Sequence, residues 1–293
     1  MRRLPVVAIA LSGALAACGG SAPTTAASTP VSTAASSASP TTSTQAIDIG
    51  GYGVDIECSG TGSPTVVFES GAGGGMDAFF LQSAEIGAKT RVCSYDRPGN
   101  GGSDDRPADA SPTTVGAMVD ELDRLLDGAD ITGPVILVGH SLGGAIVQLY
   151  ADRYPDRVAG LVFVDPSMPS TFTLFGNTWD DGSSVVDMRR SEKELAQIGS
   201  YGSIPTIVLT QSFAGDTEAP ASFKREWPRL HADLASRSTD SVHLIAVDAG
   251  HMIQDDSPDL VTAAVDEVLT AVRTGKPLKA CDDRFADVGG ACA

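Results

Sequence analysis

Basic residues are scarce in this sequence. Its 293 residues include 20 lysines and arginines against 37 aspartates and glutamates, which gives a net charge of −17 at pH 7 and a pI near 4.4. A surface this acidic repels the phosphates of nucleic acids and of anionic lipids. The composition therefore argues against a nucleic-acid partner and against adhesion to membranes through basic side chains. With 42% hydrophobic and 19% charged residues, the chain is otherwise typical of soluble globular proteins.

The N-terminal apolar segment is short. Val6–Leu15 follows two arginines and is too short to span a bilayer as a helix, a pattern typical of a signal peptide. The segment ends in Leu15-Ala16-Ala17-Cys18 followed by Gly19, which resembles a bacterial lipobox with Cys18 as the acylated residue. The alternative is ordinary cleavage at small residues. We therefore expect residues 1–18 to be a lipoprotein signal peptide and the protein to be exported, lipid-anchored on the extracytoplasmic face of the cell membrane.

Charged residues are absent from Gly19 to Ala46, a stretch made mostly of Ser, Thr, Ala and Pro. Such a composition offers no apolar periodicity to offset the entropy of ordering, so it predicts a disordered tether. A coil of about 28 residues would span on the order of 30 Å.

Short apolar runs rich in β-branched residues recur along the next part of the chain, from residue 47 to 275. They are nearly continuous in hydrophobicity, as strands covered on both faces are, and they lie at 65–68, 91–95, 135–138, 160–164, 206–209 and 244–247. Helical spacing of apolar residues at 115–126 and 146–150 separates some of them. This alternation predicts an α/β domain with a mostly parallel sheet and helices on both faces. Its ligand site should lie beyond the carboxyl ends of the strands.

Cysteine pairs with the Cys-x-x-Cys spacing of zinc sites are absent, and the four histidines are scattered, so no metal site is expected. With Cys18 assigned to lipidation, Cys58, Cys93, Cys281 and Cys292 allow three disulfide pairings. We favour Cys58 with Cys93 across the sheet and Cys281 with Cys292 in a small loop of the tail 276–293, because an exported protein is oxidised.

A candidate nucleophile lies in Gly139-His140-Ser141-Leu142-Gly143, between the apolar strand 135–138 and the start of a helix. A serine in such a strand-to-helix turn is held in a strained conformation that exposes its hydroxyl above the sheet. Glycines on both sides allow the strand and the helix to approach each other closely. The sequence therefore predicts Ser141 as a catalytic nucleophile.

A serine hydroxyl needs a base, and four histidines are available. His140 adjoins Ser141, but neighbouring side chains in this turn diverge. His231 lies in a predicted helix, where packing or a solvated face explains it, and His243 starts a strand at the wrong end. His251 follows that strand at its carboxyl edge, beside the predicted position of Ser141. His251 is therefore the predicted base.

Two aspartates compete for the acid that would orient His251. Asp165 directly follows the strand 160–164, whereas Asp216 lies a few residues beyond the strand 206–209. Each also has a structural interpretation, Asp165 as a loop cap before Pro166 and Asp216 as a turn residue. We favour Asp165 slightly and keep Asp216 as the alternative. The backbone N–H groups of Leu142 and of Ala72, in the glycine-rich loop 69–75, are the candidate oxyanion donors.

These motifs, in this order, resemble the α/β-hydrolase superfamily over essentially all of the predicted domain. The resemblance rests on Glu69-Ser70-Gly71, on 94–103 (SYDRPGNGGS), on the turn 139–144 and on Gly250-His251. It implies the α/β-hydrolase fold with a short cap inserted at about 167–203, and an esterase- or lipase-like serine hydrolase without a cofactor. The segment 94–103 would shape the floor behind the nucleophile. Many members have His-Gly where this chain has Ser70-Gly71, so the detail of its oxyanion loop is left open.

The predicted cap has two interpretations. Its apolar residues, Met168, Phe172, Leu174, Phe175 and Trp179, would either line an acyl or alcohol pocket under a mobile cap or attach the insertion to the core.

The expected reaction is cleavage of a carboxylic ester or related acyl bond, in a small-molecule or lipid substrate, through an acyl-enzyme on Ser141. Alternatives on the same fold are a cofactor-free perhydrolase, a carbon–carbon hydrolase and a non-catalytic envelope-binding protein. Haloalkane dehalogenases and epoxide hydrolases carry aspartate at the position of Ser141, which argues against those activities.

Overall fold

The computed structural model describes residues 43–293, apart from the side chains of Ser43, Thr173 and Phe175. The predicted signal peptide, Cys18 and most of the predicted tether lie outside the described residues. Within residues 43–293, no helix is both long and apolar enough to cross a membrane.

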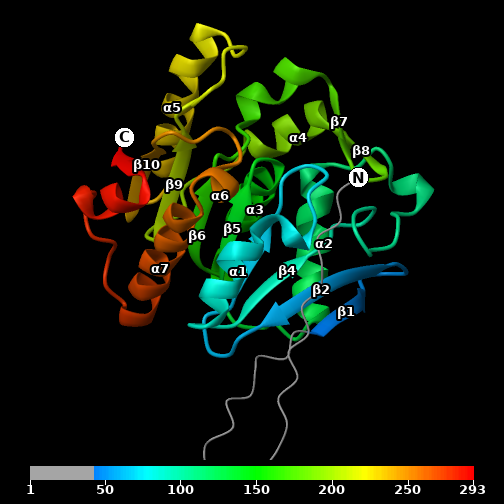
Figure 1. The fold of residues 1–293 in the computed structure, drawn as a ribbon. Coiled ribbons are helices and arrows are strands. Elements are labelled where there is room, and N and C mark those ends of the chain that lie inside the picture. Colours follow the sequence, from blue (N-terminus) through cyan, green and yellow to red (C-terminus); the bar gives the residue numbers. More distant parts are fainter. Residues whose placement is uncertain (1–42) are drawn as a thin grey trace, which may run out of the picture. The chain divides into compact units, whose positions relative to one another are not determined.

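One sheet of nine strands organises the described residues, in the order β1-β2-β4-β3-β5-β6-β9-β10-β11 (Figure 1). The six strands from β4 to β10 in this order run parallel, whereas β1, β2 and β11 are antiparallel to their neighbours. All six predicted strands are present. The bounds are β1 Ser43–Asp48, β2 Gly53–Ser59, β3 Val66–Glu69, β4 Val92–Tyr95, β5 Val135–His140, β6 Val158–Val164, β9 Thr206–Gln211, β10 Ser241–Ala246 and β11 Gly290–Cys292.

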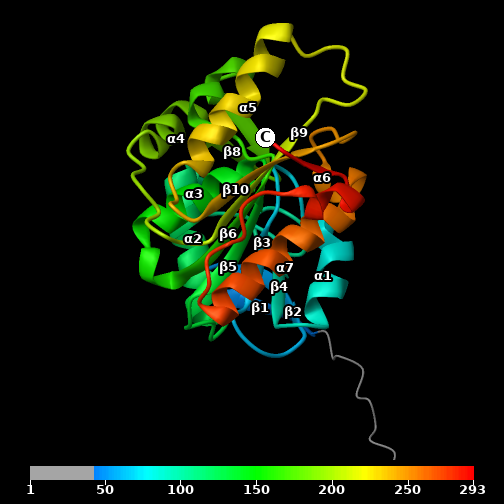
Figure 2. The same ribbon diagram turned by 90° about the vertical axis from the view of Figure 1, so that its left-hand side faces the viewer.

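Helices cover both faces of this sheet, as Figure 2 shows. On one face lie α1 (Phe80–Gly87) and α7 (Pro258–Thr274); on the other lie α2 (Val115–Gly128), α3 (Leu142–Arg153) and α5 (Ala221–Ala235). Alternate residues of one strand enter different cores: Ile136 of β5 packs with the first pair of helices and Leu137 with the second group. Because both faces of the sheet are buried, its strands have to be hydrophobic along their whole length. This arrangement of a mostly parallel sheet between two layers of helices confirms the predicted fold class.

The insertion predicted at 167–203 lies between β6 and β9. It contains the 3-10 helix η4 (Pro169–Phe175), the hairpin of β7 (Thr178–Asp181) and β8 (Ser184–Asp187), and the helix α4 (Met188–Leu195). Phe172 and Val186 are fully buried in the core beside α2 and α3, so these apolar side chains do attach the cap to the core.

Two predicted boundaries are wrong. The tether was expected to extend to Ala46, but residues 43–48 form β1, which pairs in register with β2. The tail 276–293 was expected outside the domain, but its last strand, β11, extends the sheet by pairing with β10. In both cases backbone hydrogen bonds to an existing sheet edge order a segment that lacks its own apolar periodicity.

The structure contains both favoured disulfides, Cys58–Cys93 and Cys281–Cys292. Cys58 and Cys93 are directly opposite each other on β2 and β4, and Cys292 lies in β11. The first disulfide therefore links two neighbouring strands, and the second ties the C-terminal strand to the preceding loop.

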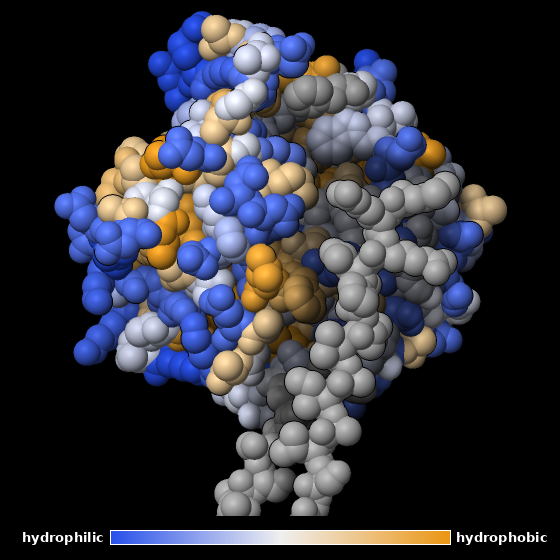
Figure 3. All heavy atoms as spheres, viewed as in Figure 1, coloured by the Kyte–Doolittle hydropathy of each residue, from blue (hydrophilic) through white to orange (hydrophobic). Residues whose placement is uncertain are grey.

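The surface of the described residues exposes few large apolar side chains. Figure 3 shows one face, on which hydrophilic side chains predominate and hydrophobic ones form small groups between them. Large apolar side chains are exposed at a few positions, among them the adjacent Phe80 and Leu81 of α1 and Leu174 of the cap. Some exposed apolar side chains are normal on protein surfaces.

Candidate active site

Ser141 lies in the sharp turn that connects β5 to α3, with φ of 51° and ψ of −118°. This left-handed conformation is rare for a residue with a side chain and has to be held by its surroundings. Gly143 shows how tight the turn is, because a Cβ atom there would lie 2.3 Å from the carbonyl oxygen of Glu69. The strained strand-to-helix turn that the glycines predicted is present.

The hydroxyl of Ser141 faces a small cavity. This cavity has a volume of about 290 Å³, and its lining residues are Ser141, Ser167, Thr171, Trp179, Gln211, Phe223, Trp227 and His251. Within residues 43–293, the hydrogen-bond partner of the Ser141 hydroxyl is Ser167, with 3.5 Å between the two Oγ atoms. Ser167 N–H also donates to the carbonyl of Ser141 at 2.9 Å. The nucleophile candidate and the base candidate therefore share one cavity.

His251 is paired with Asp165. Its Nδ1 lies 2.6 Å from Asp165 Oδ2; the histidine side chain is 44% exposed, whereas the carboxylate is fully buried. Burial by itself would raise the pKa of Asp165, but the hydrogen bond from His251 holds this pKa below its ordinary value. A charged carboxylate at Nδ1 keeps the proton on that nitrogen and leaves Nε2 of His251 free to accept one.

Three further hydrogen bonds hold the Asp165 carboxylate. Gln211 donates to it from its backbone N–H at 3.0 Å and from Nε2 at 2.8 Å, and Trp227 donates from Nε1 at 2.8 Å. Asp165 has a φ of 41° and therefore, like Ser141 after the neighbouring strand β5, has the positive backbone φ that is rare for a residue with a side chain. The sequence could place Asp165 at a strand end, but no local pattern predicts partners from β9 and α5.

Asp216, the alternative acid, lies elsewhere. Its carboxylate accepts hydrogen bonds from Glu218 N–H at 2.7 Å and from Ala219 N–H at 2.9 Å, in the turn before α5. The interpretation of Asp216 as a turn residue is the one that the structure supports, and the structure does not bring it to His251.

His140 has a part that its sequence position did not indicate. It is buried, and its Nε2 donates to the backbone carbonyl of His251 at 2.9 Å. Burial, with the adjacent His251 as a smaller cause, lowers the pKa of His140 to about 4. His140 is therefore neutral near pH 7 and acts as a hydrogen-bond donor that holds the loop of His251.

The remaining two histidines form a chain behind Asp165. His231 Nε2 is 2.9 Å from the carbonyl of Pro166, and its Nδ1 is 2.7 Å from Thr210 Oγ1, which is 2.8 Å from His243 Nε2. A carbonyl only accepts, so Nε2 of His231 carries the proton and its Nδ1 accepts from Thr210. Burial lowers the pKa of His231, which matches this neutral state. Packing or a solvated face was the expected role of His231; the structure buries it, and its hydrogen bond to the carbonyl of Pro166 also holds the residue after Asp165.

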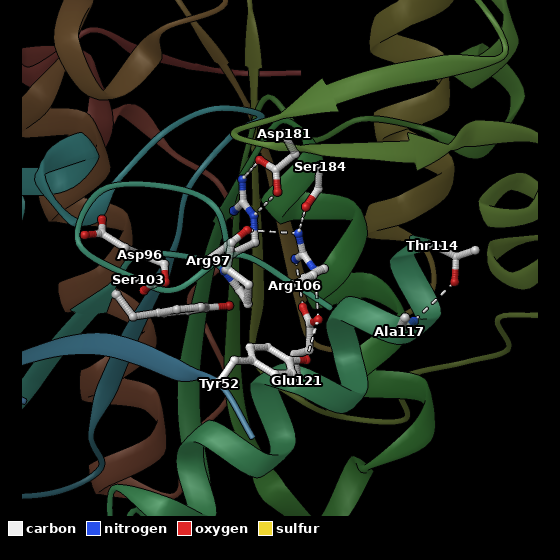
Figure 4. A network of polar contacts seen from close by, with 12 residues as sticks. Tyr52, Asp96, Arg97, Ser103, Arg106, Thr114, Ala117, Glu121, Asp181 and Ser184 are labelled. Carbon is white, nitrogen blue, oxygen red and sulfur yellow. Dashed lines mark hydrogen bonds and ion pairs between the residues drawn. The ribbon is translucent and has the colours of Figure 1, made fainter. Parts of the chain in front are cut away.

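Arg97 organises the glycine-rich loop that precedes α1 (Figure 4). Its buried guanidinium donates to the carbonyls of Ser70 at 2.6 Å and Gly71 at 2.5 Å, and it pairs with Glu69 at 2.6 Å. It also pairs with Asp181 of β7 at 2.7 Å. Arg97, in segment 94–103, therefore holds this loop, and the expectation that the segment forms the floor behind the nucleophile stays a prediction.

Asp181 links this loop to the cap. Besides Arg97, its carboxylate accepts from the backbone N–H of Gly73 at 2.9 Å. The N–H groups of Ala72, in this loop, and of Leu142, at the start of α3, have no hydrogen-bond partner within residues 43–293.

A second arginine ties down the same hairpin, as Figure 4 also shows. Arg106 donates to Ser184 of β8 at 2.8 Å and pairs with Glu121 of α2 at 2.8 Å. Tyr52 donates to the same Glu121 at 3.0 Å. The hairpin is thus attached to the core by buried polar contacts at both of its strands, in addition to apolar packing.

Comparisons with known proteins agree with this fold. A sequence model of a family described as alpha/beta hydrolase fold matches residues 64–202. YqjL of Bacillus subtilis, an uncharacterized protein, is 28% identical over 229 residues, which cover 72% of this chain and 86% of YqjL. A thermophilic esterase from Thermogutta terrifontis has a TM-score of 0.57 at 22% identity, over 80% of this chain and 99% of that one. Est1E from Butyrivibrio proteoclasticus, solved with ferulic acid, has a TM-score of 0.58 at 16% identity, over 78% and 99%.

The protein has the α/β-hydrolase fold. The matched family model and the solved structures agree on this fold.

The first prediction concerns Arg97. Arg97→Gln leaves Glu69 and Asp181 buried without a cation, so we expect the free energy of unfolding to fall by about 3 to 5 kcal/mol in urea titrations. Lys89→Gln is the control: it breaks the exposed Lys89–Asp266 pair and should cost less than about 1 kcal/mol. Equal losses in the two variants would contradict the role assigned to Arg97.

The second prediction concerns pH. Unfolded His140 binds a proton below its ordinary pKa of 6.5, whereas folded His140 does so only near 4. The stability that neutral His140 contributes is therefore full above pH 6.5 and is lost as the pH falls toward 4. In His140→Gln, the stability lost between pH 7 and pH 5 should be smaller than in wild type by about 2 kcal/mol. Parallel stability–pH curves for the two proteins would show that the pKa of His140 is ordinary.

Proposed function

We propose that this protein is a serine hydrolase that cleaves a carboxylic ester or a related acyl bond, with Ser141 as nucleophile, His251 as base and Asp165 as acid. The observation that carries the proposal is the 2.6 Å contact between His251 and the buried carboxylate of Asp165, in the cavity that Ser141 lines. The fold and the esterases and lipases that share it support a hydrolase.

The reaction follows from these positions. Rotation of the Ser141 side chain turns its hydroxyl from Ser167 toward His251 Nε2, which takes the proton as Oγ attacks the carbonyl carbon. The N–H groups of Leu142 and Ala72 donate to the oxygen that becomes negative. The carbon–oxygen bond of the ester then breaks, and the leaving alcohol receives the proton from His251.

Water completes the cycle. His251 takes a proton from a water molecule, whose oxygen attacks the acyl-enzyme carbonyl. The bond to Ser141 breaks, the acid product leaves, and Oγ regains its proton from His251. Throughout, Asp165 stabilises the charged imidazolium, and its hydrogen bonds from Gln211 and Trp227 keep the carboxylate in the orientation that this requires.

Covalent labelling tests the nucleophile and the acid. A fluorophosphonate probe should label the wild-type protein and fail to label Ser141→Ala. Asp165→Asn should lower kcat for p-nitrophenyl acetate by about 10⁴-fold, because the imidazole loses its oriented tautomer. Asp216→Asn is the matched substitution and should stay within about tenfold of wild type. An unlabelled wild-type protein would instead favour a non-catalytic binding role.

We also propose that the protein is exported and anchored in the cell membrane through acylated Cys18. The sequence Leu15-Ala16-Ala17-Cys18 supports this, and so do two disulfides, which are typical of an oxidising compartment. In cells fed an alkyne-tagged fatty acid, the wild-type protein should carry the label and sediment with membranes. Cys18→Ser should lose both properties, whereas the nearby Ser21→Ala should keep both; a labelled Cys18→Ser protein would disprove the anchor.

A further inference from the structure

Two histidines lie close to the carboxylate of Asp165. His251 Nδ1 is 2.6 Å from its Oδ2, and His231 Nδ1 is 3.9 Å from its Oδ1. The first contact is a hydrogen bond, whereas the second is too long to be one. The side chains of His231 and Asp165 are both fully buried. Because a buried negative charge favours a positive charge on either ring, the two histidines compete for one carboxylate.

The Asp165 carboxylate does not need a hydrogen bond from His231. A carboxylate offers about four acceptor sites. Oδ1 accepts from the backbone N–H of Gln211 and from Trp227 Nε1, whereas Oδ2 accepts from Gln211 Nε2 and from His251 Nδ1. With these donors in place, the acceptor sites of the carboxylate are filled while His231 stays neutral.

One carbonyl fixes the direction of the hydrogen bonds behind Asp165. The carbonyl of Pro166 can only accept, so His231 Nε2, at 2.9 Å, carries a proton. The neutral ring then has a bare Nδ1, which accepts from the hydroxyl of Thr210 in β9 at 2.7 Å. That hydroxyl has a single proton, so its oxygen accepts from His243 Nε2 at 2.8 Å. All donors therefore point the same way, from His243 toward Pro166.

The Thr210 hydroxyl decides the charge of His231. Its hydrogen bond occupies the lone pair of Nδ1, the one place where this ring could take up a second proton. Burial lowers the pKa of His231 and favours the same neutral state, against the attraction of Asp165. Without the hydroxyl, neutral His231 would have a buried acceptor without a donor, whereas protonated His231 could turn its Nδ1–H toward Asp165. The hydroxyl therefore removes the advantage that protonation of His231 would bring.

The far end of this chain of hydrogen bonds lies beside two cations. Lys224 and Arg229 of α5 line the same cavity as His243. Lys224 donates to the backbone carbonyl of Asp216, and Arg229 pairs with Glu226 at 3.8 Å. Both cations have partners of their own, and both would repel a positive charge on His243.

His243 is neutral as well. Burial, with His231 as a smaller cause, lowers the pKa of His243 to about 4. Near pH 7 its Nε2 therefore carries the single proton of the ring, and Thr210 accepts it. Since both rings of the chain are neutral, His251 is the histidine that shares the charge of Asp165.

We propose that Thr210 is a positioning residue of the site, whose hydroxyl keeps His231 neutral and so reserves the charge of Asp165 for His251. The proposal rests on the proposed hydrolase function. A proton on His231 would place a second positive charge beside the carboxylate and oppose the imidazolium that forms on His251 during acyl transfer. The neutral ring instead donates to Pro166 and holds the turn in which the acid lies.

Two substitutions of Thr210 in the full-length protein test the hydroxyl. Thr210→Val keeps the shape of the side chain and removes the hydroxyl, whereas Thr210→Ser keeps the hydroxyl. Relative to wild type at the same pH, Thr210→Val should lower kcat for p-nitrophenyl acetate by about tenfold or more at pH 6, because His231 then takes up a proton. At pH 9 the loss should be within about threefold, and KM should be unchanged at both pH values. Thr210→Ser should follow the wild-type profile.

Thr206→Val is the control for the loss of a buried hydroxyl. Thr206 is also buried and lies on the same strand, and its hydroxyl donates to the carbonyl of Ile204 at 2.8 Å, a bond that involves no histidine. This variant should be less stable than wild type and keep the pH profile of kcat. A loss in Thr210→Val that is equal at pH 6 and pH 9, or no loss at either, would overturn the proposal. So would the same pH-dependent loss in Thr206→Val.

NMR of protein labelled with 15N-histidine tests the protons directly. In wild type at pH 7, His231 and His243 should both be neutral with the proton on Nε2. In Thr210→Val, His231 should take up its second proton at a pH about one unit or more above the wild-type value. A neutral His231 with its proton on Nδ1, or a charged His231, in the wild-type protein would overturn the proposal even if the valine variant does not fold.

The measurements also separate this proposal from the proposed function. If the ester is hydrolysed and Ser141 is labelled, but Thr210→Val keeps the wild-type pH profile, only the role of Thr210 fails. If no ester is hydrolysed and no label enters, the hydrolase function fails, and the NMR measurement still decides the charge of His231.

Discussion

The buried carboxylate of Asp165 is the point on which the rest of the site depends. It lies directly after β6 in a left-handed conformation and accepts hydrogen bonds from β9 through Gln211, from α5 through Trp227 and from the loop after β10 through His251. A charge without solvent is stable only when donors surround it, so the three elements have to meet at one place. The position of His251 relative to Ser141, which directly follows β5, is therefore set by the same contacts that stabilise the carboxylate.

The buried guanidinium of Arg97 likewise holds together several elements, here around the glycine-rich loop near Ser141. The guanidinium of Arg97 donates hydrogen bonds to the backbone carbonyls of Ser70 and Gly71. It also forms ion pairs with the carboxylates of Glu69 and Asp181. Because Asp181 belongs to the cap hairpin, the backbone N–H groups of the loop are positioned partly by a segment that is inserted far along the chain. The cap thus contributes to the geometry of the site, and its hairpin is attached to the core by buried polar contacts on both strands. The expectation of a mobile cap stays a prediction. Any movement of the hairpin away from the core would have to break these polar contacts.

Much of the fold could be predicted from the sequence, since continuous apolar strands alternating with amphipathic helices admit few arrangements. The turn around Ser141 was also predictable, because this backbone conformation requires glycines close by in the sequence, at positions 139 and 143. The choice between Asp165 and Asp216 was open for a physical reason: both follow strands, and what separates them is a set of partners more than forty residues away in sequence. The roles of His140, Arg97 and Asp181 were missed for the same reason. Their partners lie far away in the sequence, and no local pattern predicts such contacts. The boundaries at Ala46 and after residue 275 were wrong because pairing with a sheet edge is also non-local.

The sequence by itself determined the class of fold, the strained turn of Ser141 and the edge of the sheet at which His251 lies. These features depend on residues close together in the chain or on the period of hydrophobicity, which tertiary packing does not alter. Only the tertiary structure decided which carboxylate meets His251, which charges hold the glycine-rich loop and which hydrogen bonds surround the second histidine beside that carboxylate. Those outcomes depend on the desolvation of charges and on contacts among the cap, α5 and the sheet, and such terms exist only once the chain has folded.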